Sequence, residues 1–316
     1  MAKKKLPVIV RDIRENPPPP VNFGVEKNIS YSQLSMFTQC PKKWSLQYRD
    51  GHKLSEQSIH MTFGTALHEV LQHYLDVMYA ESGAAADRID ISELFEDTLR
   101  ECYAKDYKRN KNQHFSTPEE LREFFEDGKA ILDNFKKKKG GYFSKKGWYL
   151  VGCEVPIVIA PNLRINRVKY MGYLDIVMYH EPTNTFKIID IKTSTKGWNK
   201  YAKKDESKQF QLVLYKYFFS KQYNIPIENI DIEFFIVRRK VYLDGEYPQK
   251  RIQTFTPASG RNKVNKATKN LDEFINKAFN LDGSYKDSIF NANPSKWNCT
   301  FCPFKDNKEL CDKGIS

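Results

Sequence analysis

The sequence of 316 residues lacks any long hydrophobic stretch. No run approaches the ~20 consecutive apolar residues that a membrane-spanning helix needs. The opening Met-Ala-Lys-Lys-Lys-Leu-Pro also lacks the apolar core of a secretory signal peptide. We therefore expect no membrane partner, and a place in the cytoplasm of a cell or of a viral host.

Two further absences limit the possible activities. The sequence has no G-x-x-x-x-G-K-[ST] motif, so it carries no P-loop motor of its own, and no internal repeat is visible. Cysteine is scarce, with six residues in the chain. Because cytoplasmic thiols stay reduced, these cysteines are better candidates for metal ligands than for disulfides.

The composition is otherwise that of a globular protein with a basic excess. Hydrophobic residues make up 40% and charged residues 28% of the chain, which is ordinary for a folded domain. Lys and Arg number 51 against 39 Asp and Glu, which gives a net charge of +12. This excess favours a polyanionic partner, with nucleic acid ahead of membrane, although a basic protein without such a partner would have the same composition.

Changes in composition and periodicity along the sequence predict an α/β protein with four consecutive parts. Residues 1–29 form a basic, proline-containing and partly extended arm, and residues 30–147 form a helical N-terminal part. Residues 148–280 alternate β-like and helical runs, and residues 281–316 have little periodicity but hold three cysteines. The predicted helices are 32–51, 63–79, 91–108, 118–136, 205–221 and 258–280, and the predicted strands are 148–160, 168–179, 185–192 and 231–243.

A hairpin over residues 172–193 is the most informative local feature. Two β-rich runs flank the turn residues Pro182-Thr-Asn184, and side chains alternate between the faces of a strand. The turn can therefore bring Asp175 beside Asp190, with Lys192 on the same face as Asp190. Two carboxylates that close repel each other, and a divalent cation between them would remove the repulsion and provide a catalyst.

Five motifs in one order support this interpretation. The chain contains Gly172-Tyr-Leu-Asp175, then Asp190-Ile-Lys192-Thr, then Gln211-Leu-Val-Leu-Tyr215. Upstream lie Phe63-Gly-Thr-Ala-Leu-His68 and a segment from Tyr31 that ends in Cys40-Pro. Together they resemble the RecB-like branch of the PD-(D/E)XK nuclease superfamily. The resemblance implies a restriction-endonuclease-like core, which is a mixed central sheet flanked by helices.

The resemblance also implies roles for individual residues. Asp175, Asp190, the main-chain carbonyl of Ile191 and His68 would bind Mg²⁺ or Mn²⁺. Lys192 would orient the attacking water or stabilise charge at phosphorus. Glu154 occupies the place of an acidic residue that helps to hold metal or water, although an ordinary strand-edge carboxylate would look the same. Gln211 and Tyr215 would contact the DNA backbone or support the site.

The remaining cysteines suggest a cap at the C-terminal end. Cys299-Thr-Phe-Cys302-Pro and Cys311 lie close together in sequence, and Cys40 lies far upstream. This spacing resembles the iron–sulfur nuclease subfamily, which includes the AddB-type nuclease domain and the CRISPR adaptation nuclease. The resemblance implies a 4Fe-4S cluster on these four thiolates, with Zn²⁺ as the alternative. Eight residues between Cys302 and Cys311 are more than the pattern leads us to expect.

We therefore expect a metal-dependent DNA exonuclease that acts on single-stranded ends in recombination, replication or end processing. Trp198, Lys196 and Tyr215 are candidate DNA contacts, because aromatic rings stack on unpaired bases and lysine binds phosphate. A helicase or a recombination protein would be the natural partner. Two alternatives stay open, namely a DNA-binding or DNA-loading accessory of such an assembly and an endonuclease that cuts duplex DNA.

Overall fold

The structure is a computed structural model that describes residues 5–52, 57–242 and 249–315. The chain forms two compact units, each assembled from three separate segments. The first unit comprises Met1–Pro17, Gln57–Val155 and Tyr173–Ala258, and the second comprises Pro18–Glu56, Pro156–Gly172 and Ser259–Ser316. Both units are discontinuous, so their bounds differ from the four consecutive parts expected from the sequence.

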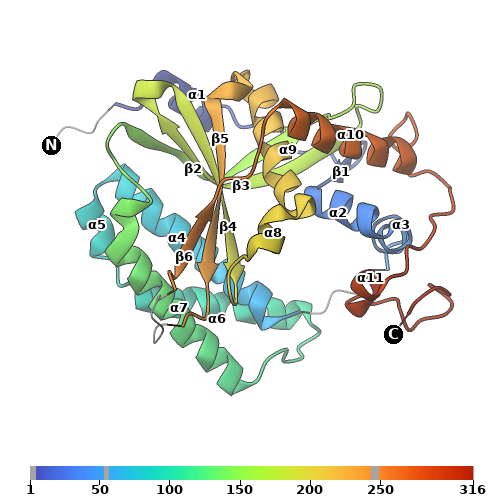
Figure 1. Cartoon of the computed structure of the whole chain (residues 1–316), viewed down its shortest axis with the longest axis horizontal. Helices are drawn as coiled ribbons and strands as arrows, with labels where there is room; N and C mark the ends of the chain where they lie inside the picture. The colour runs from blue at the N-terminus through green and yellow to red at the C-terminus, as the bar shows by residue number, and fades with distance from the viewer. Residues whose placement is uncertain (1–4, 53–56, 243–248, 316) are drawn as a thin grey trace. The chain divides into compact units, whose positions relative to one another are not determined.

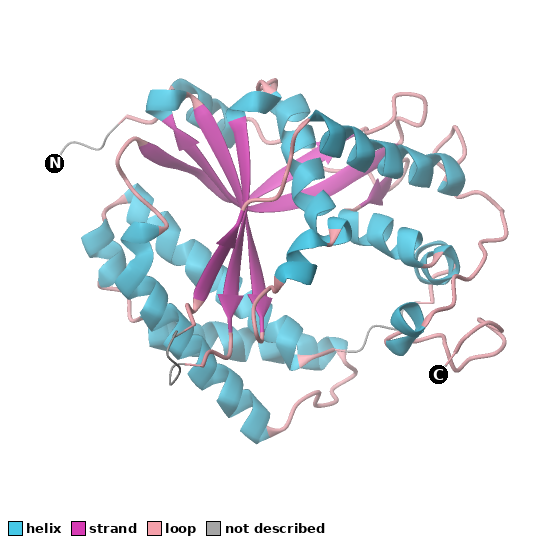
Figure 2. Cartoon of the chain, viewed as in Figure 1, coloured by secondary structure: helices cyan, strands magenta, loops and turns pink. Residues whose placement is uncertain are grey.

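The strands of the described residues belong to one mixed sheet (Figure 2). Hydrogen bonds join them in the order β1-β3-β4-β5-β6, and β2 also pairs with β3. The β1–β3 and β4–β5 pairs are parallel, and the β3–β4 and β5–β6 pairs are antiparallel. Their bounds are β1 (Lys27–Ile29), β2 (Trp148–Ile159), β3 (Val168–His180), β4 (Thr185–Ser194), β5 (Ile230–Arg238) and β6 (Ile252–Phe255). The expected mixed sheet flanked by helices is confirmed.

The four longest helices of the first unit begin at residues whose side chains cap them. Ser58 caps α4, Asp90 caps α6, Thr117 caps α7 in a full capping box with Glu120, and Asp205 caps α9. The helices are α1 (Val8–Glu15), α4 (Ile59–Ala80), α5 (Gly83–Asp87), α6 (Ile91–Arg109), α7 (Pro118–Lys138), α8 (Lys200–Lys204) and α9 (Glu206–Tyr223). Short 3-10 turns are η2 (Lys139–Gly141), η3 (Glu181–Thr183) and η4 (Ile227–Asn229). Figure 1 labels most of these elements.

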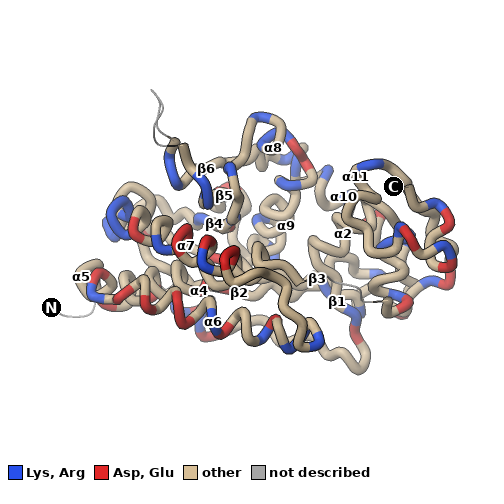
Figure 3. Tube along the Cα trace, turned by 90° about the horizontal axis from the view of Figure 1, so that it is seen from below, with Lys and Arg blue, Asp and Glu red and all other residues tan. Residues whose placement is uncertain are grey.

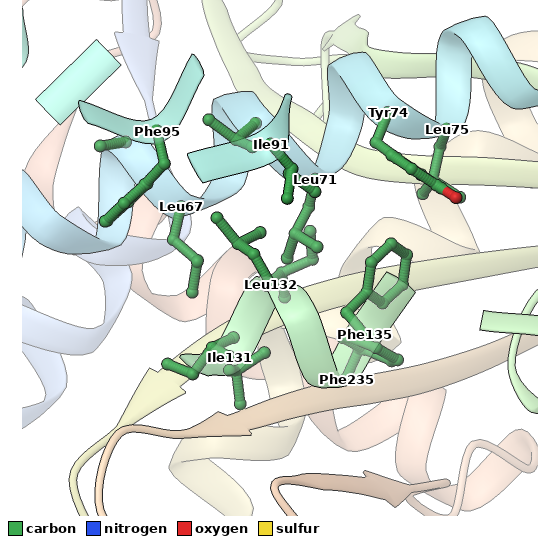
Figure 4. Close-up of a cluster of buried hydrophobic side chains, with 14 of the residues drawn as sticks. Leu67, Leu71, Tyr74, Leu75, Ile91, Phe95, Ile131, Leu132, Phe135 and Phe235 are labelled. Atoms are coloured by element: carbon green, nitrogen blue, oxygen red, sulfur yellow. The ribbon is translucent and has the colours of Figure 1, made fainter. Parts of the chain in front are cut away.

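The first unit buries its sheet between two helical layers. Side chains of α4, α6 and α7 form one hydrophobic cluster with Ile189 and Ile191 of β4 and Phe235 of β5 (Figure 4). Phe186 of β4 instead contacts Phe219 of α9, with ring centroids 5.5 Å apart. Strand β4 is therefore covered on both faces, which explains why its hydrophobic residues run almost without interruption.

The second unit packs around an aromatic cluster. Trp44 is fully buried and meets Phe37, Phe274, Phe279 and Phe290, with ring centroids 5.3–6.2 Å apart. These rings come from both ends of the chain, so they hold its early and late segments together. The elements are β1, α2 (Tyr31–Gln39), α3 (Pro41–Trp44), the π-helix η1 (Ser45–Arg49), α10 (Arg261–Ala278) and α11 (Lys296–Thr300), with the adjoining halves of β2 and β3.

The structure corrects three local expectations. The helix predicted over 32–51 is broken after Gln39 because Pro41 has no N–H to donate; Pro41 instead starts α3. The arm predicted to be partly extended contains helix α1 before the non-helical Pro17–Pro20. The strand predicted over 231–243 ends at Arg238, and residue 243 lies outside the described residues. In the part of the chain that is described, no helix is both long and apolar enough to span a membrane.

Candidate active site

The β3–β4 hairpin brings the two predicted carboxylates together. Its antiparallel pairing runs from His180 opposite Thr185 to Ile176 opposite Ile189, and Asp175 and Asp190 come next on the two strands. Asp175 Oδ2 accepts a hydrogen bond of 2.6 Å from the main-chain N–H of Ile191. The predicted hairpin is thus confirmed, and a side chain on one strand is tied to the backbone of the other.

Both carboxylates are in surroundings that disfavour their charge. Asp190 is 2% exposed, and burial raises its pKa above the usual value although the neighbouring Lys192 works in the opposite direction. Burial raises the pKa of Asp175 well above the usual value, and the charge of Asp190 raises it further. Positive charge nearby would therefore strongly stabilise the ionised form of the pair.

Lys192 supplies part of that charge. Burial alone would lower the pKa of Lys192, but Asp190 and then Asp175 raise it above the usual value, so the ammonium stays protonated. Its Nζ lies 2.7 Å from Asp190 Oδ2. Apart from this ion pair, the buried oxygen has no hydrogen-bond partner among the described residues. Nζ also donates to Gln211 Oε1, at 3.1 Å.

Helix α9 supports the lysine from the side. Gln211 Nε2 donates to the hydroxyl oxygen of Tyr215, one helical turn further on, at 3.2 Å. Tyr215 is 7% exposed, and burial raises the pKa of its hydroxyl. Gln211 and Tyr215 thus form a chain of contacts that fixes Lys192. Tyr215 is thus buried and supports the Gln211 side chain, and little of its surface is left exposed for contact with DNA.

Helix α4 brings His68 to the carboxylates. Its Nδ1 lies 3.8 Å from Asp175 Oδ2, and burial, with a contribution from the charge of Lys192, lowers the pKa of His68 to about 4. The imidazole is therefore neutral near pH 7, which is the form that binds metal ions. Gly64 lies one turn earlier, where a Cβ atom would come within 3.2 Å of Thr193 Oγ1 on β4. The glycine thus permits the close approach that places His68.

Glu154 is held by a residue that the motifs do not include. Gln72 Nε2 donates to Glu154 Oε1 at 2.6 Å and to the main-chain carbonyl of Asp175 at 3.0 Å. Gln72 lies one turn after His68 on α4, and this spacing is the signal that could have identified it. Glu154 has a φ of 51°, a left-handed conformation that costs a non-glycine residue about 1–3 kcal/mol and is concentrated at functional sites.

The site suits a divalent cation, but its side chains alone do not provide a full set of ligands. In residues 5–52, 57–242 and 249–315, no three His, Cys, Asp or Glu side chains are placed to hold a metal ion together. The buried Asp190 Oδ2, which has an ion pair with Lys192 but no hydrogen-bond partner in the described residues, lies beside a second carboxylate with a raised pKa, and such oxygens suit a divalent cation. Mg²⁺ commonly binds through one or two carboxylates and completes its shell with water and phosphate.

The predicted cysteine ligands lie in the second unit. Burial raises the pKa of the Cys302 thiol, and Cys40 and Cys299 add a smaller contribution. Cys40 Sγ accepts from the N–H of Asn293 at 3.5 Å. Cys311 donates its N–H to the Asn307 carbonyl. No metal-binding group of three or more side chains is formed here within the described ranges. The four-cysteine set therefore remains a proposal.

The predicted DNA contacts differ in their exposure. Lys196 is exposed, whereas the Trp198 ring packs on Phe234 with centroids 4.8 Å apart. Gln253 holds the Trp198 backbone through two hydrogen bonds of 3.0 and 3.1 Å. Lys208 Nζ lies 5.5 Å from the centre of the Trp198 ring. The Trp198 ring thus packs against other residues of the first unit, and a base could stack only on the part of the ring that is still exposed.

The net positive charge is unevenly divided between the units. The second unit has 18 Lys and Arg against 10 Asp and Glu, a net +8, and the first has 33 against 29, a net +4. In the first unit, α7 carries both signs of charge, with acidic residues in its first turn and lysines in its last (Figure 3). An excess of positive charge in both units favours a polyanionic partner.

Comparison with known proteins identifies the chain at the level of a family. A family model described as the PD-(D/E)XK nuclease superfamily matches residues 28–307. The crystal structure of a "Putative exonuclease" from Eubacterium rectale is similar, with 12% identity and a TM-score of 0.47 over 88% of this chain and 86% of that one. No curated protein matches the chain in sequence.

Proposed function

The chain belongs to the PD-(D/E)XK nuclease superfamily, and we propose that it is a metal-dependent deoxyribonuclease that degrades single-stranded DNA from its ends. The observation that carries the proposal is the pair of buried carboxylates beside a charged lysine. Burial raises the pKa values of Asp175 and Asp190, and in the described residues Asp190 Oδ2 is paired only with the Lys192 ammonium, 2.7 Å away. The preference for single-stranded ends comes from the resemblance of the motifs to the RecB-like branch.

The site residues would divide the work of phosphodiester hydrolysis. A divalent cation, when bound, would neutralise the two carboxylates and act as a Lewis acid on the phosphate. Asp175, Asp190, the Ile191 carbonyl and neutral His68 would hold it. Lys192, kept charged by Asp190 and oriented by Gln211, would stabilise negative charge at phosphorus or orient the attacking water.

The cysteines would have a separate, structural role. We propose Cys40, Cys299, Cys302 and Cys311 as ligands of a 4Fe-4S cluster, with Zn²⁺ as the alternative. Hydrogen bonds from Asn293 to Cys40 Sγ and from Asn298 to the Gln39 carbonyl join the early segment to the one that holds the late cysteines. Such a group would connect segments far apart in the chain, and its binding free energy would add to the free energy of folding.

A time course on end-labelled single-stranded, duplex and circular DNA, with Mg²⁺ or Mn²⁺, tests the proposed activity. We expect release of short products from linear single strands and no cleavage of circles. Cutting of circular duplex would replace the exonuclease with an endonuclease. Tight binding without cleavage of any substrate would replace the enzyme with a DNA-loading accessory of a recombination or replication assembly.

A further inference from the structure

Gln72 is a buried polar residue at the candidate site that no motif includes. It is 6% exposed, on the turn of α4 that follows His68. A buried amide is stable only when its hydrogen-bonding groups have partners. Both recorded bonds of its Nε2 go to the site: one to the Glu154 carboxylate and one to the Asp175 carbonyl.

Gln72 connects three elements at one point. Its backbone belongs to α4, Glu154 belongs to β2, and Asp175 belongs to β3. The bond to Glu154 is short, at 2.6 Å, and Glu154 has left-handed backbone geometry within a strand. Such a conformation persists only where the surroundings enforce it, and the short bond from the Gln72 amide is a side-chain contact that does so.

The chemical type of residue 72 also suits the position. The charge of Glu154 contributes to the raised pKa values of both Asp175 and Tyr215, so its carboxylate lies near the cluster. A glutamine can donate to that carboxylate without adding charge, whereas a lysine or arginine there would neutralise Glu154. The amide therefore fixes the carboxylate while leaving its negative charge available to a cation.

We propose that Gln72 is a positioning residue that orients Glu154 and the Asp175 strand for binding of the divalent cation. The inference rests on the proposed nuclease function, because it assigns Glu154 a place beside that cation. Partners that orient metal ligands typically change metal affinity about 10–100-fold when they are removed.

The test compares two buried glutamines, Gln72 in the first unit and Gln33 in the second. Gln33 is 4% exposed, accepts from Trp44 Nε1 at 3.3 Å and donates to the Asn28 carbonyl at 3.1 Å. Gln72→Met and Gln33→Met each remove two hydrogen bonds while keeping similar bulk. Three properties are measured for both variants: the melting temperature, the affinity for Mn²⁺ and the rate of steady-state cleavage. Mn²⁺ binding is followed without DNA, from the electron paramagnetic resonance signal of free Mn²⁺.

We expect both variants to melt below the wild type, and only Gln72→Met to bind Mn²⁺ about 10–100-fold more weakly. Its kcat should fall at subsaturating Mn²⁺, with the KM for DNA unchanged. Wild-type Mn²⁺ affinity in folded Gln72→Met would overturn the inference. If that variant does not fold, Gln72→Asn, whose shorter side chain cannot make both bonds, takes its place with the same criteria. A wild type that neither binds Mn²⁺ nor cleaves DNA would instead refute the proposed function.

Discussion

The carboxylates of the first unit and the cysteines of the second are held in different ways. Asp175 is bound to the Ile191 N–H and Lys192 to Gln211, through contacts that the sheet and α9 provide without any ligand. Cys299 and Cys302 instead lie on and just after the five-residue helix α11, in a C-terminal segment with little regular structure. The difference suggests that the hairpin arranges its carboxylates by folding, whereas the thiols need a bound group to be fixed.

The largest effect expected in the first unit is on catalysis. Lys192→Met keeps most of the length of the side chain and removes its charge, so kcat should fall about 10²–10³-fold because one charge-stabilising group is lost. Cleavage kinetics under saturating DNA measure the effect. The melting temperature is measured as a folding control, because the substitution also leaves the buried Asp190 without its ion-pair partner. Retention of more than a third of the wild-type kcat would remove Lys192 from the mechanism.

In the second unit, loss of a cysteine ligand should lower the stability of the protein. Cys299→Ser should abolish bound iron or zinc and lower the melting temperature by about 10 °C, because binding of the group contributes to folding. Metal analysis and visible absorption identify the lost group. Cys102→Ser in the first unit is the matched control: burial raises the pKa of this thiol to about 11, and it should change no metal content. Equal metal content in Cys299→Ser and the wild type would eliminate the cysteine site.

Close packing in the first unit predicts a smaller, purely structural effect. A Cβ atom at Gly128 of α7 would come within 2.1 Å of the Phe95 ring on α6. Gly128→Ala should therefore destabilise the protein by about 1–3 kcal/mol in urea unfolding. Gly140→Ala is the control, because nothing lies within 4 Å of its Cβ position. Unfolding of both variants at the same urea concentration would contradict the close contact between α6 and α7.

The smallest effect concerns a surface carboxylate of the first unit. Hydrogen bonds from Lys139 and Tyr74 hold the pKa of Asp87 below its usual value. Its stabilising contribution is thus present above the unfolded pKa of about 3.9 and is lost as the pH falls through the lower folded value. Asp87→Asn should cost less than about 1 kcal/mol at pH 7, because solvent screens the contact, and progressively less as the pH falls through the folded pKa. Urea unfolding against pH measures this, and a pH-independent difference would contradict it.

Local sequence patterns predicted the part of the site that lies on two paired strands. The alternation around Asp190 and Lys192 has a period of two residues, so their shared face follows directly from the β4 sequence. The motifs also selected His68, Gln211 and Tyr215, all of which lie in the first unit with the carboxylates. The roles assigned to them remain predictions.

Other features depend on contacts between distant segments and could not be predicted locally. The bond from Gln72 to Glu154 joins residues 82 positions apart, and the left-handed backbone of Glu154 has no signature in its own strand. The short strand β1 exists because it pairs in parallel with β3, not because three residues favour a strand. The break at Pro41 was visible in the sequence, but the helical periodicity across it masked the missing N–H donor.

Cleavage by Asp190→Asn is the decisive test of the proposed active site. This substitution keeps the size of the side chain and removes the charge of the buried carboxylate. Digestion of end-labelled single-stranded DNA with Mn²⁺ should be lost, whereas DNA binding in Ca²⁺ and the melting temperature should stay close to those of the wild type. Digestion by Asp190→Asn at the wild-type rate would contradict the proposed active site.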